Sequence, residues 1–515
     1  WLNQHEEIIG HNFIDFDSVQ LNKFLGISFD GIKIVDTLIL SRLYNPQLEG
    51  GHSLRAWGDR LNFPKGEHSD FNSFSPEMEQ YCIQDLKVTQ KLYNILTDKL
   101  ASFGDTSIDL EHQVQSVVTQ QIQNGWTLDQ KKCWDLLATL KERKIQLEDE
   151  VHEKFKPLPV FIKEIHPKYK KNGELSNVGI KFLGDEWRSV CGPFSRIDLP
   201  YFGWKPDNFT EKGHVIVDEA ILSKVVGIPE AQLISEYLLI QKRHAQIQSW
   251  LDAVEEDGRV RGYVNTIGAV TGRMTHSSPN MSQVPASYSP YGTECRSCWT
   301  VPKGRKLVGA DASGIELRML AHYMNDKEYT HEILHGDIHS ANQKAAGLTT
   351  RDTAKTFIYA FLYGAGDRKI GSIVGGSATD GARLKTLFLD NTPSLRDLRE
   401  RVERATVRGH LRGLDNRKLI IRSNHAALNT LLQSAASVVM KKSLTILDEY
   451  AKIYGIDYKF VGNIHDEFQA EVREDQAEKF GWLAVECIKA AGIKFNLRCP
   501  LDGEYKVGKT WADTH

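Results

Sequence analysis

Residues 351–366 read RDTAKTFIYAFLYGAG, and their apolar positions follow the period of a helix. This recurrence at i, i+3, i+4, i+7 and i+8 predicts a helix over 350–363 with one buried face. The members of the apolar stripe are Ala354, Phe357, Ile358, Phe361, Leu362 and Ala365. Beside the stripe, Arg351, Lys355, Tyr359 and Tyr363 follow at steps of four, so they share a neighbouring face. This row of two cations and two phenols either lines the boundary of the core or binds a ligand.

The composition is that of a globular chain with room for several domains. The chain has 515 residues, of which 41% are apolar and 25% charged, with a formal net charge of −3. No run of 18 apolar residues occurs, so no membrane span is expected. Seven scattered cysteines predict a reduced intracellular chain without disulfides, and the CxxC of Cys295 and Cys298 supplies too few ligands for a structural zinc. Because the chain starts at Trp1 and shows no signal peptide, we expect a fragment or processed chain.

Three regions differ in pattern along the chain. Residues 1–105 alternate short apolar runs with helical segments, which is typical of an α/β arrangement. Residues 106–253 contain long amphipathic helices, interrupted by a polar stretch at about 156–215. From residue 258 onward the pattern is mixed, and YKFVGNIHDEFQAEV (458–472) predicts a hairpin with His-Asp near its tip. Basic clusters are expected to be solvated faces; they occupy 141–144, 168–171, 241–244 and 303–306.

Two short motifs match functional patterns in an unfavourable context. HEILH (331–335) fits the HExxH of zinc peptidases, with Glu332 as the base, but Gly336 is expected to end the helix. A zinc hydrolase therefore stays a weak alternative. GEYKVGKT (503–510) fits a phosphate-binding loop, but too few residues follow it to form the helix such a loop requires.

Two distant carboxylates suggest a metal site. Asp311 ends the apolar run LVGAD, and Asp466 and Glu467 lie at the turn of the predicted hairpin. A carboxylate at the end of a buried strand needs a cation or another partner. Mg²⁺ prefers carboxylate and phosphate oxygens, and paired metals serve phosphoryl transfer. Together with cations for a polyphosphate and phenols for a nucleoside, these carboxylates indicate nucleotidyl transfer.

Several long motifs resemble those of family-A DNA polymerases, especially the replicative polymerases of short-tailed bacteriophages. Those motifs are VGADASGIELR, RDTAKTFIYAFLYGAG, IHDEFQ, TGRMTHSSPNMSQVP, SPYGTECR, HGDIHSANQ and HAALNTLLQSA. The resemblance implies an α+β right hand: an antiparallel-sheet palm, helical fingers and thumb, and an N-terminal α/β RNase H-like 3′–5′ exonuclease domain. The domains it implies are exonuclease-like 1–105, thumb 106–253, palm 254–322, fingers 323–428 and palm again 429–515.

The resemblance also implies a role for each matching residue. Asp311 and Asp466, with the Ala312 carbonyl, would bind two Mg²⁺ ions, for which Mn²⁺ can substitute, and Glu467 would support them. The triphosphate contacts would be His339, Arg351 and Lys355. Tyr359 with Glu316 would meet the sugar and exclude a 2′-OH. Tyr363 and Gly364 would lie at the nascent base pair. The DNA contacts would be Arg273, Asn429, Gln433 and His465, with Arg273 and Gln433 in the minor groove.

The exonuclease-like region matches the family only in part. Asp17 in HNFIDFD corresponds to its second motif, and Tyr81 and Asp85 in YCIQD to its third, with Asp17 and Asp85 as metal ligands. The first motif, a DxE pair on an earlier strand, does not occur in this chain, so we expect no proofreading. The thumb insertion that binds thioredoxin in the most similar relatives is expected to be reduced, at about 156–200.

The expected function is therefore DNA-templated DNA synthesis in phage genome replication, in the cytoplasm of an infected bacterium. Expected partners are primer-template DNA and dNTPs, with a replicative helicase-primase and a single-stranded DNA-binding protein as further candidates; thioredoxin is not expected to bind. A single-subunit RNA polymerase of the same palm fold stays an alternative, against which Glu316 and the exonuclease-like region argue.

Overall fold

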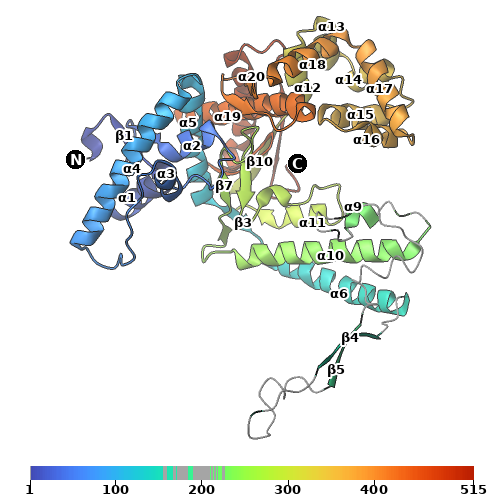
Figure 1. The fold of residues 1–515 in the computed structure, drawn as a ribbon, viewed down its shortest axis with the longest axis horizontal. Helices are drawn as coiled ribbons and strands as arrows, with labels where there is room; N and C mark the ends of the chain where they lie inside the picture. Colours follow the sequence, from blue (N-terminus) through green and yellow to red (C-terminus); the bar gives the residue numbers. More distant parts are fainter. Residues whose placement is uncertain are drawn as a thin grey trace. The chain divides into compact units, whose positions relative to one another are not determined.

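The computed structural model describes residues 2–154, 159–165, 170, 184–189, 209, 213, 216, 218–222, 225 and 227–515. The chain forms two compact units (Figure 1). The first unit comprises Trp1–Leu128, Glu255–Ser287 and Trp299–His515, and the second comprises Asp129–Val254 and Tyr288–Cys298. Within the described residues, no helix has the length and apolarity that crossing a membrane requires.

A four-stranded antiparallel sheet lies at the centre of the first unit. Its order is β13-β14-β10-β15. The strands are β10 (Arg305–Ala312), β13 (Tyr458–Ile464), β14 (Glu467–Arg473) and β15 (Gly503–Gly508). The predicted hairpin is confirmed, with His465 and Asp466 as the turn between β13 and β14. Most of the sequence that matches a phosphate-binding loop forms strand β15.

α20 (Ala477–Lys494) packs on this sheet, and α19 (Ala427–Ile453) forms the next layer. α20 contacts β10 and β15, and α19 packs on α20. α19 is buried on nearly every side over its middle turns, as expected of a helix that is apolar almost all round. α12 (Ile315–Met324) follows β10 directly and packs on α19, which places the end of β10 beside two helix surfaces.

A helical region follows α12 in the chain. It contains α13 (Lys327–His335), α14 (Ile338–Ala346), α15 (Arg351–Leu362), α16 (Asp367–Ile373), α17 (Ala378–Asp390) and α18 (Pro393–Thr406), followed by the hairpin β11 (His410–Arg412) and β12 (Lys418–Ile420). The opening stretch forms α15, capped by the Thr350 side chain, which accepts from Thr353 N. Its apolar stripe is buried as predicted, except that Ala365 lies beyond the helix end. The helix stops because Gly364 has a φ of +76°, in the left-handed region.

The N-terminal residues form a small α/β arrangement with its own apolar core. Parallel strands β1 (Glu7–Gly10) and β2 (Lys33–Asp36) are accompanied by helices, among them the one-turn helix η2 (Phe13–Asp17). The helices are α1 (Ser18–Leu25), α2 (Thr37–Tyr44), α3 (Leu54–Arg60) and α4 (Pro76–Leu100). This agrees with the α/β pattern that the sequence predicted for residues 1–105.

Helix α5 (Asp105–Asn124) belongs to the first unit, whereas we expected residues 106–253 to form the thumb together. α5 packs on α19 and β13. The chain then enters β3 (Trp126–Leu128), which pairs with β6 (Arg259–Val260) and β9 (Trp299–Thr300). A second hairpin follows, formed by β7 (Tyr263–Asn265) and β8 (Thr275–Ser277).

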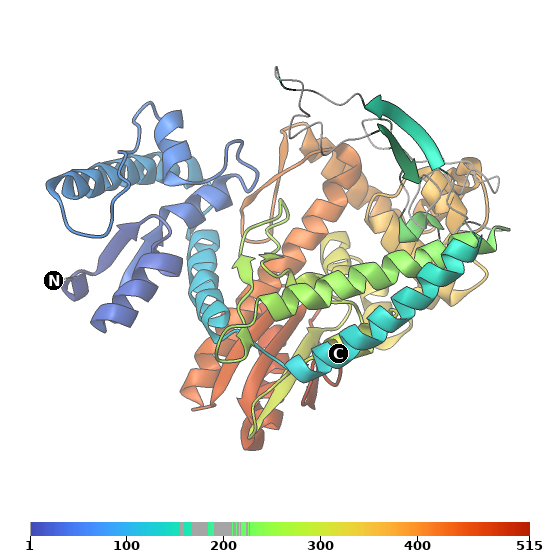
Figure 2. The ribbon, with the colours of Figure 1, turned by 90° about the horizontal axis from the view of Figure 1, so that it is seen from below.

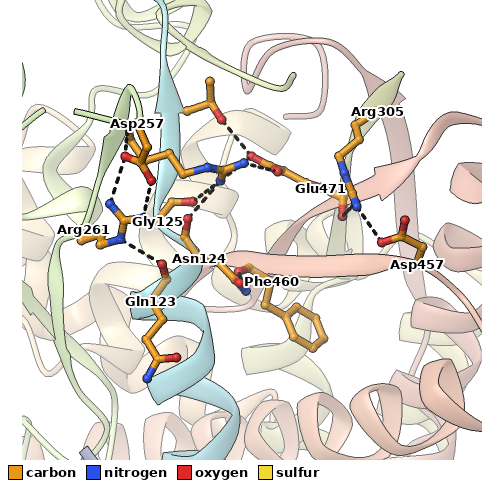
Figure 3. Close-up of polar contacts among 11 residues, drawn as sticks. Gln123, Asn124, Gly125, Asp257, Arg261, Arg305, Asp457, Phe460 and Glu471 are labelled. Atoms are coloured by element: carbon orange, nitrogen blue, oxygen red, sulfur yellow. Dashed lines mark hydrogen bonds and ion pairs between the residues drawn. The ribbon is translucent and has the colours of Figure 1, made fainter. Parts of the chain in front are cut away.

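Polar contacts join the C-terminal end of α5 to the four-stranded sheet (Figure 3). Glu471 of β14 is fully buried and forms a two-point ion pair with Arg259, at 2.9 and 3.0 Å. Arg259 also donates to the carbonyls of Asn124 and Gly125, both at 3.0 Å. Asn124 donates to the carbonyl of Phe460 in β13 at 2.9 Å. The C-terminus of α5 is thereby fixed to two strands of the sheet.

In the second unit, α6 (Gln130–Lys154) and α10 (Pro229–Asp252) lie side by side (Figure 2). Arg143 of α6 pairs with Glu236 of α10 at 2.8 Å. The unit also contains β4 (Pro159–Ile165), β5 (Gly184–Ser189), α9 (Glu219–Leu222) and α11 (Gly292–Ser297). Most of the expected reduced insertion at 156–200, and most of the basic cluster at 168–171, lie outside the described residues.

Candidate active site

The sheet brings the two predicted metal-binding aspartates to the same edge. Asp311 is opposite Glu467 in the β10–β14 register, and Ala312 N donates to the Asp466 carbonyl at 3.1 Å. Asp311 is exposed as a residue, yet loss of hydration raises the pKa of its carboxyl to about 7, and the charges of Asp466 and Glu467 raise it further. Burial also raises the pKa of Asp466. Each carboxylate is therefore disfavoured as an anion unless a cation joins the pair.

Glu467, opposite Asp311 in the register, is buried and accepts hydrogen bonds from protein donors. Its carboxylate accepts from Trp511 Nε1 at 2.9 Å, from His515 Nδ1 at 2.8 Å and from the Gln469 amide. Burial alone would raise the pKa of Glu467, but these hydrogen bonds outweigh burial and lower the pKa. Glu467 is thus an anion whose lone pairs are committed to protein donors.

The donor set suits a hard divalent cation that shares its shell with a substrate. No group of three or more His, Cys, Asp or Glu among the described residues is arranged to hold a metal ion. Mg²⁺ is commonly bound through one or two carboxylates together with phosphate and water oxygens. Asp311 and Asp466, with the adjacent Ala312 carbonyl, fit that pattern.

Glu316, at the start of α12, joins the opening stretch to the β7–β8 hairpin. It accepts from Arg273 Nη2 at 3.0 Å and from the Tyr363 hydroxyl at 2.7 Å. The Tyr359 and Tyr363 ring centroids are 6.3 Å apart. Burial, and then the charges of Glu316 and Asp466, raise the pKa of Tyr359. The phenol end of the predicted row therefore lies beside the carboxylates.

The other end of α15 carries the cations. Arg351 Nε donates to Asp337 Oδ2 at 2.7 Å, and this ion pair holds the pKa of Asp337 far below its usual range. Lys355 is exposed, and within the described part of the chain its ammonium makes no hydrogen bond or ion pair. His339 Nδ1 is buried without a hydrogen-bond partner there, and burial together with Arg351 and Lys355 lowers the pKa of His339. Lys355 and His339 Nδ1 are therefore available to bind an anionic ligand.

The structure separates the last member of the row from the helix. Arg351, Lys355 and Tyr359 lie on α15, whereas Tyr363 follows its last residue. A Cβ added to Gly364 would lie 2.5 Å from the carbonyl oxygen of His425. Glycine is therefore required here by the left-handed φ and by this close backbone, in addition to any space that a base pair needs.

The predicted DNA contacts come from three elements. Asn429 and Gln433 are one turn apart on α19, and both are partly exposed. Their side-chain amides make no hydrogen bond to other described residues. His465 occupies the β13–β14 turn with a φ of +60°. Arg273 and His465 line a small cavity of about 20 Å³. Arg273 and His465 lie close enough to Asp466 for their charges to act on its carboxyl, as a ligand passing along that edge would require.

The exonuclease-like residues are brought together in two separate sets. Burial, and then the charge of Asp36, raise the pKa of Asp17 at the end of η2. Tyr81 and Asp85 share one face of α4, where Lys65 pairs with Asp85 at 2.8 Å and lies 4.8 Å from the Tyr81 ring centroid. Among the described contacts, none joins Asp17 to Asp85.

Several residues near these sites were not assigned by the sequence analysis. They are Lys65, Asp36, Asp337, Trp511 and His515. Asp337 lies in the quoted HGDIHSANQ motif, where its place before a helix could have identified it as an N-cap.

The HExxH histidines lie on α13, which ends at His335 as predicted. The His331 and His335 ring centroids are 5.1 Å apart, but no third ligand joins them in the described residues. A zinc site at this helix would therefore lack part of its usual ligand set.

Comparisons with known proteins agree on one family. A family model described as DNA polymerase family A matches residues 196–513. DNA-directed DNA polymerases of Enterobacteria phage T3 and Escherichia phage T7 are each 35% identical over 649 residues, covering 99% of this chain and 92% of the relative. DNA polymerase I of Pseudomonas aeruginosa is 24% identical and covers 84% of this chain and 47% of its own. In fold, the chain is similar to the POL domain of Pol1 from M. smegmatis in complex with DNA primer-template and dNTP, with a TM-score of 0.80, 19% identity, and coverage of 98% and 86%.

Proposed function

The chain belongs to DNA polymerase family A and is a DNA-directed DNA polymerase, and we propose that it extends a primer by a two-metal mechanism at Asp311 and Asp466. The observation that carries this proposal is the pairing of these two carboxylates at one edge of the sheet, with both pKa values raised. Two Mg²⁺ ions bound there would activate the primer 3′-OH and neutralise the triphosphate and leaving pyrophosphate. Mn²⁺ would serve in their place.

The chain's own residues bind and orient the nucleotide. Arg351, Lys355 and His339 contact the triphosphate. Arg351 exchanges its ion pair with Asp337 for one with a phosphate, and the unpartnered Nδ1 of His339 gains an acceptor when protonated. Glu467, fixed by its three protein donors, holds the hairpin turn in place rather than binding a cation directly.

The sugar and base meet the other half of the row. Tyr359 packs against the deoxyribose, and with Glu316 it leaves no room for a 2′-OH. Tyr363, hydrogen-bonded to Glu316, lies at the templating base, next to Gly364. The sequence order along α15 and on to Tyr363 therefore follows phosphate, sugar and base.

The DNA duplex passes along Arg273, Asn429, Gln433 and His465. Arg273 and Gln433 donate to minor-groove acceptors, which every correct pair presents alike. Primer-template DNA and dNTP are named for the M. smegmatis neighbour, which supports the same ligands here.

Alanine at Asp311 or Asp466 tests the mechanism. Each variant is expected to lose primer extension by at least about 10³-fold while keeping primer-template affinity within a few-fold, because the carboxylates act on the reacting groups. Asp475→Ala, at the exposed far end of β14, is the matched control and should extend normally. Retained extension in either site variant would refute the assignment.

A single-subunit RNA polymerase was the alternative within the palm fold. Parallel extension assays with dNTPs and rNTPs on one template discriminate the two, and dNTPs are expected to be strongly preferred. Tyr359→Ala and Glu316→Ala should narrow that preference.

The remaining assignments are proposals of the same kind. The exonuclease-like region 1–105 is proposed to have weak or no 3′–5′ activity in this chain, because Asp85 is paired with Lys65 and not with Asp17. Degradation of labelled single-stranded DNA measures this directly. The further regions are thumb 106–253, palm 254–322 and 429–515, and fingers 323–428; the compact-unit division would start the thumb at Asp129.

Partners and location follow from the phage relatives. The alignments extend over 649 positions while this chain has 515 residues, so the phage polymerases carry internal segments without a counterpart here. This supports a reduced thumb insertion and replication without thioredoxin. We place the enzyme in the cytoplasm of an infected bacterium, with a helicase-primase and a single-stranded DNA-binding protein as further candidates.

A further inference from the structure

Arg273 lies on a loop whose two ends contact α5 and α19, and whose Ile267 packs in the N-terminal apolar core. We define the Arg273 loop as residues 266–274, between β7 and β8. Within the loop, Gly272 N donates to the Ala269 carbonyl at 2.8 Å, and Ala269 N donates to the Arg273 carbonyl at 3.2 Å. These bonds shape the loop, and the contacts at its two ends set where it lies.

The first end of the loop is tied to α5 by a buried hydrogen bond. The Thr266 hydroxyl donates to Gln115 Oε1 at 2.8 Å, and Thr266 and Gln115 are 0% and 2% exposed. The amide of Gln115 donates in turn to Asp15 Oδ1 at 2.7 Å. Gln115 is thus held at both ends of its side chain, and its carbonyl oxygen has a fixed position for Thr266.

The second end of the loop rests on a buried group of four charges. Glu111, Asp415, Arg417 and Lys441 are each at most 4% exposed, and Glu111 pairs with Arg417 and Lys441 at 2.7 Å. The Arg417 guanidinium leaves no space for a Cβ at Gly272, which would lie 2.7 Å from Nη1.

Ser437 of α19 donates to the Gly272 carbonyl at 3.0 Å. Arg273 is therefore preceded by a residue fixed on two sides. Its own guanidinium then reaches Glu316.

We propose that Gln115 and Thr266 are positioning residues for Arg273 in the polymerase reaction. They touch neither DNA nor nucleotide, and act by setting where the Arg273 loop begins. The inference rests on the proposed role of Arg273 at the primer-template. It also means that one side chain of α5 joins Asp15, in the exonuclease-like region 1–105, to the Arg273 loop.

A double-mutant cycle in the full chain tests the proposal. Single-turnover incorporation of a correct dNTP is measured on primer-template for Gln115→Leu, Thr266→Val, Arg273→Ala and the two pairs with Arg273→Ala. We expect Arg273→Ala to lower kcat/KM by about tenfold or more, and Gln115→Leu and Thr266→Val by about three- to tenfold. The pairs should be no slower than Arg273→Ala alone, because the positioning residues act only through it.

Two further variants separate positioning from general loss of structure. Thr266→Ser keeps the hydroxyl and should restore normal incorporation. Gln113→Ala, exposed on another face of α5, should leave the rate unchanged. If Gln115→Leu fails to fold, the Thr266→Val and Thr266→Ser pair still decides.

Each remaining outcome has a defined meaning. The inference is overturned if the fold-losses in kcat/KM of the two substitutions multiply in either double variant. It is also overturned if Gln115→Leu and Thr266→Val incorporate at normal rates while Arg273→Ala is slow. If Arg273→Ala extends normally, the assigned role of Arg273 and the inference both fall, whereas the metal mechanism is judged separately by Asp311→Ala.

Discussion

Glutamine in place of Glu111 is expected to weaken the packing of α5 on α19 by an amount that falls as pH rises. The Glu111 carboxylate is fully buried, and both its oxygens accept from Lys441 Nζ at 2.7 Å. It also accepts from Arg417 Nη2 at 2.7 Å. Glutamine has nearly the same shape but no charge, so Asp415 becomes the one anion for two buried cations.

The two cations respond differently, which sets the magnitude. Arg417 cannot release its proton, and the loss of one charge-assisted hydrogen bond costs about 1.5–3 kcal/mol. Burial, opposed by Glu111, already lowers the pKa of Lys441 to about 8. Loss of the Glu111 charge lowers this pKa further, and deprotonation of Lys441 limits the added cost at pH 7 to about 1.4 kcal/mol. The total is about 3–4 kcal/mol at pH 7.

The sign of the pH dependence follows from proton counts. In the unfolded chain Lys441 keeps its proton to about pH 10.4, whereas the folded variant has released it at neutral pH. The unfolded state therefore binds more protons, and the stability of the variant rises with pH. In the wild type this rise begins only near the folded pKa of about 8. The gap between the two proteins narrows by about 1 kcal/mol between pH 7 and pH 8.

Amide hydrogen exchange of peptides from α5 and α19 measures this gap. At pH 7 the variant is expected to exchange about several hundredfold faster than the wild type. At pH 8 this ratio should be about fivefold smaller. The double variant Glu111→Gln with Lys441→Met is the control, and its gap should not change between these pH values. Equal protection at pH 7, or a pH-independent gap in the single variant, would refute the reasoning.

Three further predictions concern single positions. Gly364→Ala should slow extension by about tenfold or more at nearly unchanged DNA affinity, as measured by single-turnover kinetics, because the new Cβ meets the His425 carbonyl; normal rates would contradict this. Glu471→Gln should destabilise the sheet by about 3–5 kcal/mol in hydrogen exchange of β14, since it leaves Arg259 without its buried counter-charge; unchanged protection would contradict it. Tyr363→Phe removes the bond to Glu316 and should lower kcat/KM by about three- to tenfold, with intact rates as the contrary result.

Features set by neighbouring residues could be predicted from the sequence. The α15 stripe, the His-Asp turn and the end of α13 at His335 all follow from periodicity and turn residues within a few positions. The prediction that Asp311 lies beside Asp466 rested on a longer-range pattern, in which two distant apolar runs each end in a carboxylate. The structure pairs β10 with β14 and so brings these two carboxylates together.

Features set by long-range pairing could not be predicted in this way. Glu467 accepts hydrogen bonds from Trp511 and His515, which follow it by 44 or more residues in the sequence. Glu111 and Lys441 are 330 residues apart. Helical periodicity shows which face of α5 is buried, but not which partner it meets, so residues 106–124 were grouped with the thumb helices that follow them.

The buried Glu111 limits how the enzyme can be shortened. A fragment lacking the N-terminal α/β residues has to retain Glu111 within an intact α5, because a start beyond Glu111 removes the carboxylate that Lys441 and Arg417 share beneath the Gly272 backbone. Cutting before α5 removes partners of His112 and Gln115, and it also uncovers the apolar side chains of Ile108 and Ile267, which pack in the N-terminal core. A minimal polymerase derived from this chain therefore keeps α5, although the expected domain boundaries assign this helix to the thumb.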